Sequence, residues 1–205
     1  APGATVSVEP FLTRFLEAAR LRITVELAAM YALTFGGFVA FGVYLPLYLR
    51  EVYGLTIADA AARAAGFVVL ATVARPIGGR LSDQIGGRRV LAGALAVVVV
   101  CAVIVSFQPV MPLATAGFLT MAAALGFGNG AVFAMLGRAV PVRMVGSATG
   151  VVGAAGGLGG FLPPIVMGLI YQASGSYAIG LMLLAAVASA GFVYCWFVLR
   201  VDEAI

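Results

Sequence analysis

A charged side chain occupies a position in the chain where a charge is costly. Arg75 lies nine residues into an apolar run that begins at Gly66, and Pro76 follows it directly. Placing a charged side chain at membrane depth costs about 2.5–3.5 kcal/mol on insertion scales. A guanidinium offers a rigid fork of donors that suits a planar oxyanion, so Arg75 is a candidate anion ligand. The alternative is a structural arginine that donates to helix carbonyls near Pro76.

Few other side chains in the apolar runs can do chemistry. Asn129 is polar at membrane depth, and it can hydrogen-bond either within a helix bundle or to a substrate; the residues alone leave both readings open. Cys101 and Cys195 lie in apolar runs and are expected to be small hydrophobic side chains. The chain has no histidine and no CxxC motif, so we expect no metal site, no cofactor and no enzymatic activity.

The composition indicates a membrane protein. Hydrophobic residues make up 63% of the 205 residues and charged residues 10%. Soluble domains are about 45–50% apolar and about 25% charged. The basic residues lie between apolar runs and form no continuous basic stripe, so the lipid bilayer is an expected partner and nucleic acid is not.

Six apolar segments are each close to the roughly 20 residues that span a bilayer as a helix. Runs this long and continuous predict helices, because the strands of a membrane barrel would alternate with period two. The predicted fold class is therefore all-α, with six transmembrane helices. The segments cover residues 25–49, 58–82, 88–108, 110–137, 146–171 and 176–199.

The chain before the first span predicts a separate region. We expect residues 1–24 to be a cytoplasmic linker with a short amphipathic helix, and residues 25–205 to be the six-helix bundle. A helical extension of the first span is the alternative. The apolar residues at helical spacing are Phe11, Leu12, Phe15, Leu16 and Ala19, and the polar ones on the other side are Arg14, Glu17 and Arg20.

The arginines predict an orientation, since the chain has no lysine. With the N-terminus in the cytoplasm, nine arginines fall inside and only Arg50 and Arg63 fall outside, which agrees with the positive-inside rule. We therefore expect a multi-pass protein of the cytoplasmic (inner) membrane with both termini in the cytoplasm. The nine are Arg14, Arg20, Arg22, Arg80, Arg88, Arg89, Arg138, Arg143 and Arg200.

The loop "GGRLSDQIGGRRV" resembles the major facilitator superfamily motif G-x-L-x-D-x-x-G-R-[RK]. The residues that match in order are Gly79, Leu81, Asp83, Gly86 and Arg88, with Gly87 as an extra residue before the pair Arg88 and Arg89. Asp83 is expected to pair with one of these arginines or to cap a helix end. The resemblance implies a loop that latches one conformation of a transport cycle; the alternative is an ordinary basic loop with a turn.

The fifth span is rich in glycine. It contains the pairs Gly146/Gly150, Gly153/Gly157 and Gly156/Gly160, and a spacing of four lets a neighbouring helix approach closely. The pattern predicts that this helix is buried along its glycine face, with Gly153 and Gly157 against a neighbour. The glycines of the signature are Gly150, Gly153, Gly156, Gly157, Gly159 and Gly160.

Three stretches together resemble the nitrate/nitrite porter family of that superfamily. They are "GVVGAAGGLGGF", "GFGNGAVF" and "MYALTFGGFVAF", which are similar to the family's eleventh, tenth and seventh helices. The resemblance covers the second half only, which implies the C-terminal six-helix half of a twelve-helix porter. The short echo of "GGFVAF" in "NGAVFA" agrees with an inverted repeat.

The resemblance also implies roles for residues. Arg75 would be this half's arginine at the midplane site, Tyr31 would donate a hydrogen bond to nitrate or nitrite, and Phe35 would pack over the anion's face. A second six-helix half, in the same or a separate chain, would supply the other wall, and the two would alternate access around the site.

Two rival functions remain open. One is a half-transporter or a porter for another small anion, and the other is a six-helix membrane protein that does not transport. Glu26, Glu51, Asp59 and Asp83 all lie at helix ends or loops, and a proton relay needs carboxylates at membrane depth. Their placement favours anion exchange over proton symport.

Overall fold

Seven α-helices and one short 3-10 turn make up the structure, a computed structural model that describes residues 11–199. Six of the helices are long and apolar enough to span a bilayer, as predicted. The helices are α1 (Phe11–Arg20), α2 (Arg22–Tyr53), α3 (Ile57–Ile85), α4 (Gly87–Ser106), α5 (Met111–Ala139), α6 (Val145–Ser174) and α7 (Ala178–Phe197), with the turn η1 (Val142–Met144) before α6.

The boundaries of the helices follow from local sequence signals. Gly54 follows the last residue of α2 and Gly175 follows that of α6, both with φ of 65° in the left-handed region that favours glycine. Thr56 caps the start of α3, where its hydroxyl accepts a hydrogen bond from the backbone N–H of Asp59 at 3.2 Å. Gly86, with φ of 92°, makes the turn between α3 and α4, which confirms the turn predicted for the loop motif.

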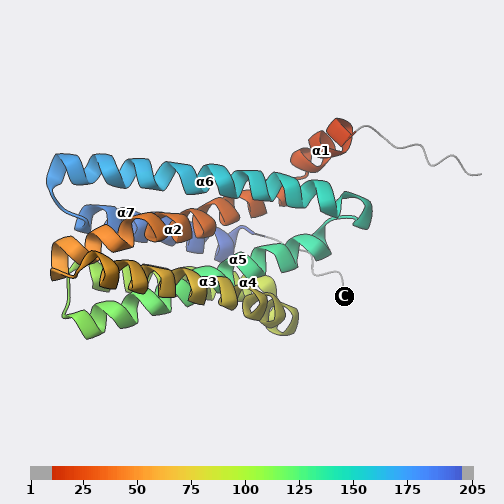
Figure 1. Ribbon diagram of the computed structural model, residues 1–205. Helices are drawn as coiled ribbons and strands as arrows, with labels where there is room; N and C mark the ends of the chain where they lie inside the picture. Colours follow the sequence, from red (N-terminus) through yellow and green to blue (C-terminus); the bar gives the residue numbers. More distant parts are fainter. Residues whose placement is uncertain (1–10, 200–205) are drawn as a thin grey trace, which may run out of the picture.

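The six long helices run alternately up and down, so the described chain begins and ends at the same end of the bundle (Figure 1). The prediction that both ends lie on one side is confirmed for this part of the chain. α2 packs mainly on α6 and α3 mainly on α5, while α4 lies between α5 and α7. α5 is the most buried span, and α6 and α3 are among the least buried, so these two present most of their surface outward.

α1 is a separate helix. Leu21 has extended backbone angles (φ −69°, ψ 123°) and interrupts the helix, so the alternative of a continuous extension of the first span is wrong. α1 lies beside the start of α6 (Figure 1) and packs on α6 and on α2. Its Ala18 is fully buried and its Leu16 is exposed. The side chains of Phe11 and Leu12, and Arg200, lie outside the described residues.

A close contact of two backbones joins α2 to α6. Pro163 has no N–H, so the carbonyl of Gly159 lacks its helical donor, and Gly36 of α2 lies directly against that carbonyl. On the other side, Gly159 lies against the backbone of Ala32. Any side chain at Gly36 or Gly159 would collide with backbone, which cannot move aside as a flexible side chain can.

The predicted glycine face of α6 is corrected by the structure. Gly156 packs on Tyr31 and Gly160 on Val39, but Gly153 and Gly157 are exposed with no neighbour within 4 Å among the described residues. Around the helix axis, Gly157 is rotated by about 100° from Gly156, and Gly153 is rotated by about 60° from Gly156. Gly153 and Gly157 therefore form a different stripe from Gly156 and Gly160. Both stripes have a spacing of four, so spacing alone did not identify the stripe that faces α2.

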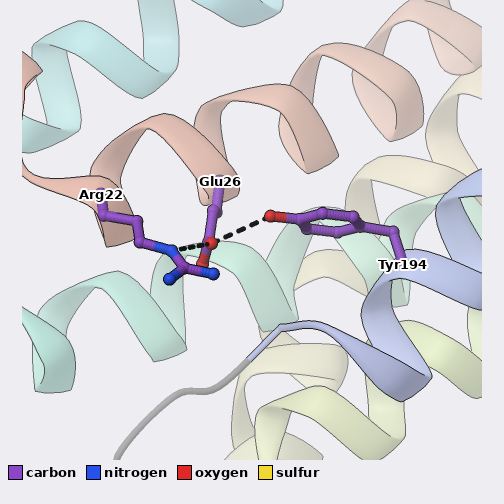
Figure 2. A network of polar contacts seen from close by, with 3 residues as sticks. All are labelled: Arg22, Glu26 and Tyr194. Carbon is purple, nitrogen blue, oxygen red and sulfur yellow. Dashed lines mark hydrogen bonds and ion pairs between the residues drawn. The ribbon is translucent and has the colours of Figure 1, made fainter.

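Hydrogen bonds join the first turns of α2 to the last turn of α7 (Figure 2). Arg22 Nε and Tyr194 Oη both donate to the same oxygen of Glu26, at 2.6 Å and 2.9 Å. Glu26 is 9% exposed, and Arg22 lies mostly in the open. The two donors offset part of the cost of burying this carboxylate.

The two stripes of α6 should respond oppositely to the same substitution. Gly159→Ala places a methyl group on the backbone of Ala32, and overpacking of this kind costs about 1–3 kcal/mol. Gly157→Ala meets open space and removes the helix penalty of glycine, worth up to about 1 kcal/mol. Thermal unfolding of the two purified variants measures this. A melting temperature lowered equally by both variants would contradict the packing described.

Candidate functional site

Arg75 lies on α3 where the backbones of α3 and α5 come very close. Gly130 of α5 lies against the backbone carbonyl of Arg75, and Gly126 lies against the carbonyl of Ala71 one turn earlier. Gly78 on α3 in turn lies against the backbone of Phe127. These glycines fix the height and rotation of α3 on α5, and with them the point from which the arginine side chain extends.

The guanidinium of Arg75 lies over two aromatic rings of α2. Its central carbon is 5.3 Å from the ring centre of Phe35 and 5.0 Å from that of Phe38. A contact of this type contributes about 0.5–1 kcal/mol at an exposed site and about 2 kcal/mol when desolvated, and the half-buried Arg75 lies between these cases. The two phenylalanines lie nearly one helical turn apart, so together they hold the charged plane against α2.

No polar group in residues 11–199 pairs with this guanidinium. Arg75 Nε is buried without a hydrogen-bond partner, and the described ion pairs and side-chain hydrogen bonds do not involve Arg75. The structural alternative, in which Arg75 donates to helix carbonyls near Pro76, is therefore not the arrangement observed. The side chain is partly exposed, so its terminal nitrogens remain open to a ligand.

Tyr31 joins this cluster through Phe35. The two rings stack at 5.2 Å, and Phe133 of α5 meets Tyr31 edge-on at 4.8 Å. Gly156 of α6 makes room for the Tyr31 ring. Tyr31 is 6% exposed, yet its hydroxyl is neither completely covered nor bonded to a described residue, so it is an available donor beside the arginine cluster.

Asn129 is held inside the bundle. Its side chain is fully buried, and the hydroxyl of Thr34 on α2 donates to its Oδ1 at 2.7 Å. Of the two readings left open by the sequence, the structure contains the bond within the bundle. The amide nitrogen Nδ2 is buried and has no partner among the described residues.

The loop motif forms a different ion pair from the predicted one. Asp83 at the end of α3 accepts from Arg138 Nη2 at the end of α5, at 2.7 Å, and not from Arg88 or Arg89. After the turn at Gly86, Arg88 and Arg89 belong to the first turn of α4. α5 packs along α3, so Arg138 at the end of α5 lies near Asp83. Both partners are about half exposed, and such pairs contribute at most about 1 kcal/mol.

A cavity of about 450 Å³ lies elsewhere in the bundle, between α2, α6 and α7. Its walls are almost entirely apolar, with residues such as Ala32, Phe41, Leu162 and Leu184. It offers no charged donor to an anion, so the chemistry of an anion site belongs to the Arg75 cluster. That cluster forms one wall: a cation, two rings and a free hydroxyl.

The structure places Arg75, Phe35 and Tyr31 in one cluster, and their role in binding stays a prediction. Phe38 and Thr34 also lie there and were not predicted. Phe38 follows Tyr31 and Phe35 at the positions i, i+4 and i+7, which lie on one face of a helix. This spacing was a usable signal. Thr34 gave no signal, because a threonine in an apolar helix usually bonds to its own helix backbone.

The fold is that of one six-helix half of a known superfamily of membrane proteins. The family model of the Major Facilitator Superfamily matches residues 27–204. The solved superfamily transporter FucP, in its outward conformation, superposes with a TM-score of 0.75 at 19% identity, over 93% of this chain and 46% of that one. A bacterial Spinster homologue in an inward-facing, occupied conformation gives a TM-score of 0.64 over 88% and 50%.

The chain belongs to the Major Facilitator Superfamily. It is 46% identical over 196 residues to a probable nitrate/nitrite transporter, NarK2, of Mycobacterium tuberculosis, covering 95% of this chain and 50% of the relative. A nitrite extrusion protein of Bacillus subtilis is 46% identical over 82% of this chain and 42% of its own length. The chain thus spans about half the length of these relatives, and the predicted likeness to nitrate/nitrite porters is confirmed.

A matched pair of α5 variants tests how Arg75 is seated. Gly130→Ala places a methyl group on the Arg75 carbonyl and should cost about 1–3 kcal/mol of stability. Gly137→Ala, on the same helix, meets open space and should be neutral or slightly stabilising. Chemical or thermal unfolding in detergent compares them. Equal stability of the two variants would show that α3 and α5 do not touch at Gly130.

Proposed function

We propose that this chain is the C-terminal six-helix half of a porter that carries nitrate or nitrite across a membrane by alternating access. The names of its sequence relatives support this substrate, and the motifs of α2, α5 and α6 support the C-terminal position. Arg75 is the anion ligand that this half contributes, Tyr31 donates to the anion, and Phe35 lies beside it. Under this proposal Asn129 acts within the protein.

One observation carries the proposal: a guanidinium in a membrane-spanning helix that has no counter-ion in residues 11–199. Ionisable residues inside membranes normally pair with one another or mark a substrate pathway. A planar oxyanion would supply the missing negative charge and accept from the terminal nitrogens. The rings of Phe35 and Phe38 hold the guanidinium ready for this contact.

A second six-helix bundle would supply the opposite wall, since porters of this superfamily bind substrate at the midplane between two halves. The positive-inside bias of the arginines supports cytoplasmic ends, a cytoplasmic N-terminal linker over residues 1–24 and a cytoplasmic (inner) membrane location. We propose that the Asp83–Arg138 pair and the turn at Gly86 form a latch at that cytoplasmic end, with Gly79, Arg88 and Arg89 completing the loop.

The acidic residues support exchange of anions. Glu26 lies one turn inside α2, but it is held by Arg22 and Tyr194 on the side of α2 about 180° from Phe35. Its place in a structural tie, away from the arginine cluster, argues against a role as a proton carrier on the pathway. Anion exchange needs no such carrier.

The substitution Arg75→Lys, made in the complete twelve-helix porter, tests the proposed function. Lysine keeps the charge but loses the planar fork of donors. Lost hydrogen bonds to a charged group are worth about 1.5–3 kcal/mol, so nitrate affinity should fall about tenfold to a hundredfold while expression and thermal stability stay near wild type.

Arg63→Lys is the matched control, because Arg63 lies exposed on the same helix and donates only a long bond to Thr115 at 3.4 Å. Its nitrate affinity should equal that of the wild type. A well-folded Arg75→Lys porter whose affinity stays within a factor of about two of wild type would reject Arg75 as the anion ligand.

A further inference from the structure

The contact between Thr34 and Asn129 is a side-chain hydrogen bond that joins α2 to α5 inside the bundle. Both side chains are almost completely covered, at 1% and 0% exposure, and the oxygen atoms lie 2.7 Å apart. A buried polar group that lacks a partner costs about 1–3 kcal/mol. The pair therefore favours one registration of α5 on α2, because sliding either helix would leave the buried amide of Asn129 without its partner, while Thr34 would keep the carbonyl of Met30 at 3.0 Å.

The bond does not depend on how the amide of Asn129 is oriented. With Oδ1 toward Thr34, the threonine hydroxyl donates to it. With the amide turned, Nδ2 would donate to Thr34 Oγ1, and the hydroxyl would donate to the carbonyl of Met30 at 3.0 Å. The link between the two helices is present in both cases, and one amide atom stays unpartnered.

This link lies next to the point where α5 seats Arg75. Gly128 faces the methyl group of Thr34, the side chain of Asn129 accepts a hydrogen bond from the Thr34 hydroxyl, and Gly130 lies against the backbone carbonyl of Arg75. Three consecutive residues of α5 thus contact α2 on one side and α3 on the other. On α2, Thr34 directly precedes Phe35, one of the two rings under the guanidinium.

We propose that Thr34 and Asn129 are positioning residues for the anion site. Their bond sets α5 against α2, Gly130 transmits that placement to the Arg75 backbone, and the guanidinium is thereby held over Phe35 and Phe38. Asn129 acts through Arg75 and does not touch the anion. The role rests on the proposed function for its substrate, but the geometry it describes exists without substrate.

The experiment compares Thr34→Val and Asn129→Leu with wild type in the complete porter. Both changes keep size and remove the hydrogen bond. Thr24→Val is the matched control, since Thr24 lies on the same helix, is fully buried and has a hydroxyl without a partner among the described residues. Thr24→Val makes the same chemical change as Thr34→Val but removes no hydrogen bond between helices.

The first readout needs no anion. The side-chain Nε–H signal of Arg75 in nitrogen NMR is identified as the signal lost in Arg75→Lys. In nitrate-free samples it should shift or broaden in Thr34→Val and in Asn129→Leu, and stay in place in Thr24→Val. An unchanged signal in the first two variants would overturn the positioning role, whatever the substrate is.

The second readout is nitrate affinity in a double-mutant cycle. Thr34→Val should weaken binding about twofold to tenfold, the worth of one net hydrogen bond, and should add almost nothing when Arg75 is already lysine. Independent, multiplying effects would overturn the proposal. A loss in Asn129→Leu without a loss in Thr34→Val would also overturn it, by making Asn129 a direct ligand.

If the unaltered porter does not bind nitrate, the proposed function is rejected. The NMR signal of Arg75 in the nitrate-free variants then decides the positioning role by itself. Restoration of both the Arg75 signal and the affinity by Thr34→Ser, which keeps the hydroxyl, is the expected rescue. A Thr34→Ser porter that behaves like Thr34→Val, although it keeps the hydroxyl, would show that a hydroxyl at this position does not restore the placement of Arg75 and would overturn the role of the hydrogen bond.

Discussion

The positive charge of Arg75 lies within a bundle of apolar helices, and no carboxylate in residues 11–199 neutralises it. A charge in this setting is retained only when its surroundings offset the desolvation cost. The surroundings observed here are two phenylalanine rings, which stabilise a cation but consume none of its hydrogen-bond donors. The arginine is thus held in place while its donors stay available, which is the condition that an anion ligand must satisfy.

The glycines of the bundle hold Arg75 and the aromatic rings in place, because they let helix backbones come close together. In a bilayer, apolar side chains gain little by leaving lipid, so helices associate through close packing of small residues. Gly126 and Gly130 set α5 on α3, and Gly36 and Gly159 set α2 on α6. The first pair fixes the origin of the Arg75 side chain. The second fixes the helix that carries Tyr31, Phe35 and Phe38.

The fold was predictable because its signals are coarse and redundant. Six long apolar runs, each ended by glycine, proline or charged residues, define the helices within a few residues. The Arg75 cluster was partly predictable, because a family resemblance located Tyr31 and Phe35, and helical spacing could have added Phe38.

The contacts between helices depend on how each helix is rotated about its own axis. The spacing of residues along the sequence does not determine that rotation. The two glycine stripes of α6 have the same spacing, and only the packed structure shows that Gly156, Gly159 and Gly160 face α2 while Gly153 and Gly157 do not. The predicted pairing of Asp83 with Arg88 or Arg89 was wrong for a similar reason. Arg138 is distant in sequence and becomes a neighbour only when α5 packs on α3. The bond between Thr34 and Asn129 joins residues 95 positions apart.

An experimental structure of the complete porter with bound nitrate tests the account most directly, at a resolution that defines the Arg75 guanidinium. We expect a planar anion in contact with the terminal nitrogens of Arg75 and within hydrogen-bond reach of the Tyr31 hydroxyl. Phe35 and Phe38 should still lie against the guanidinium. A guanidinium paired instead with a carboxylate of the second half, with no anion beside it, would contradict the account.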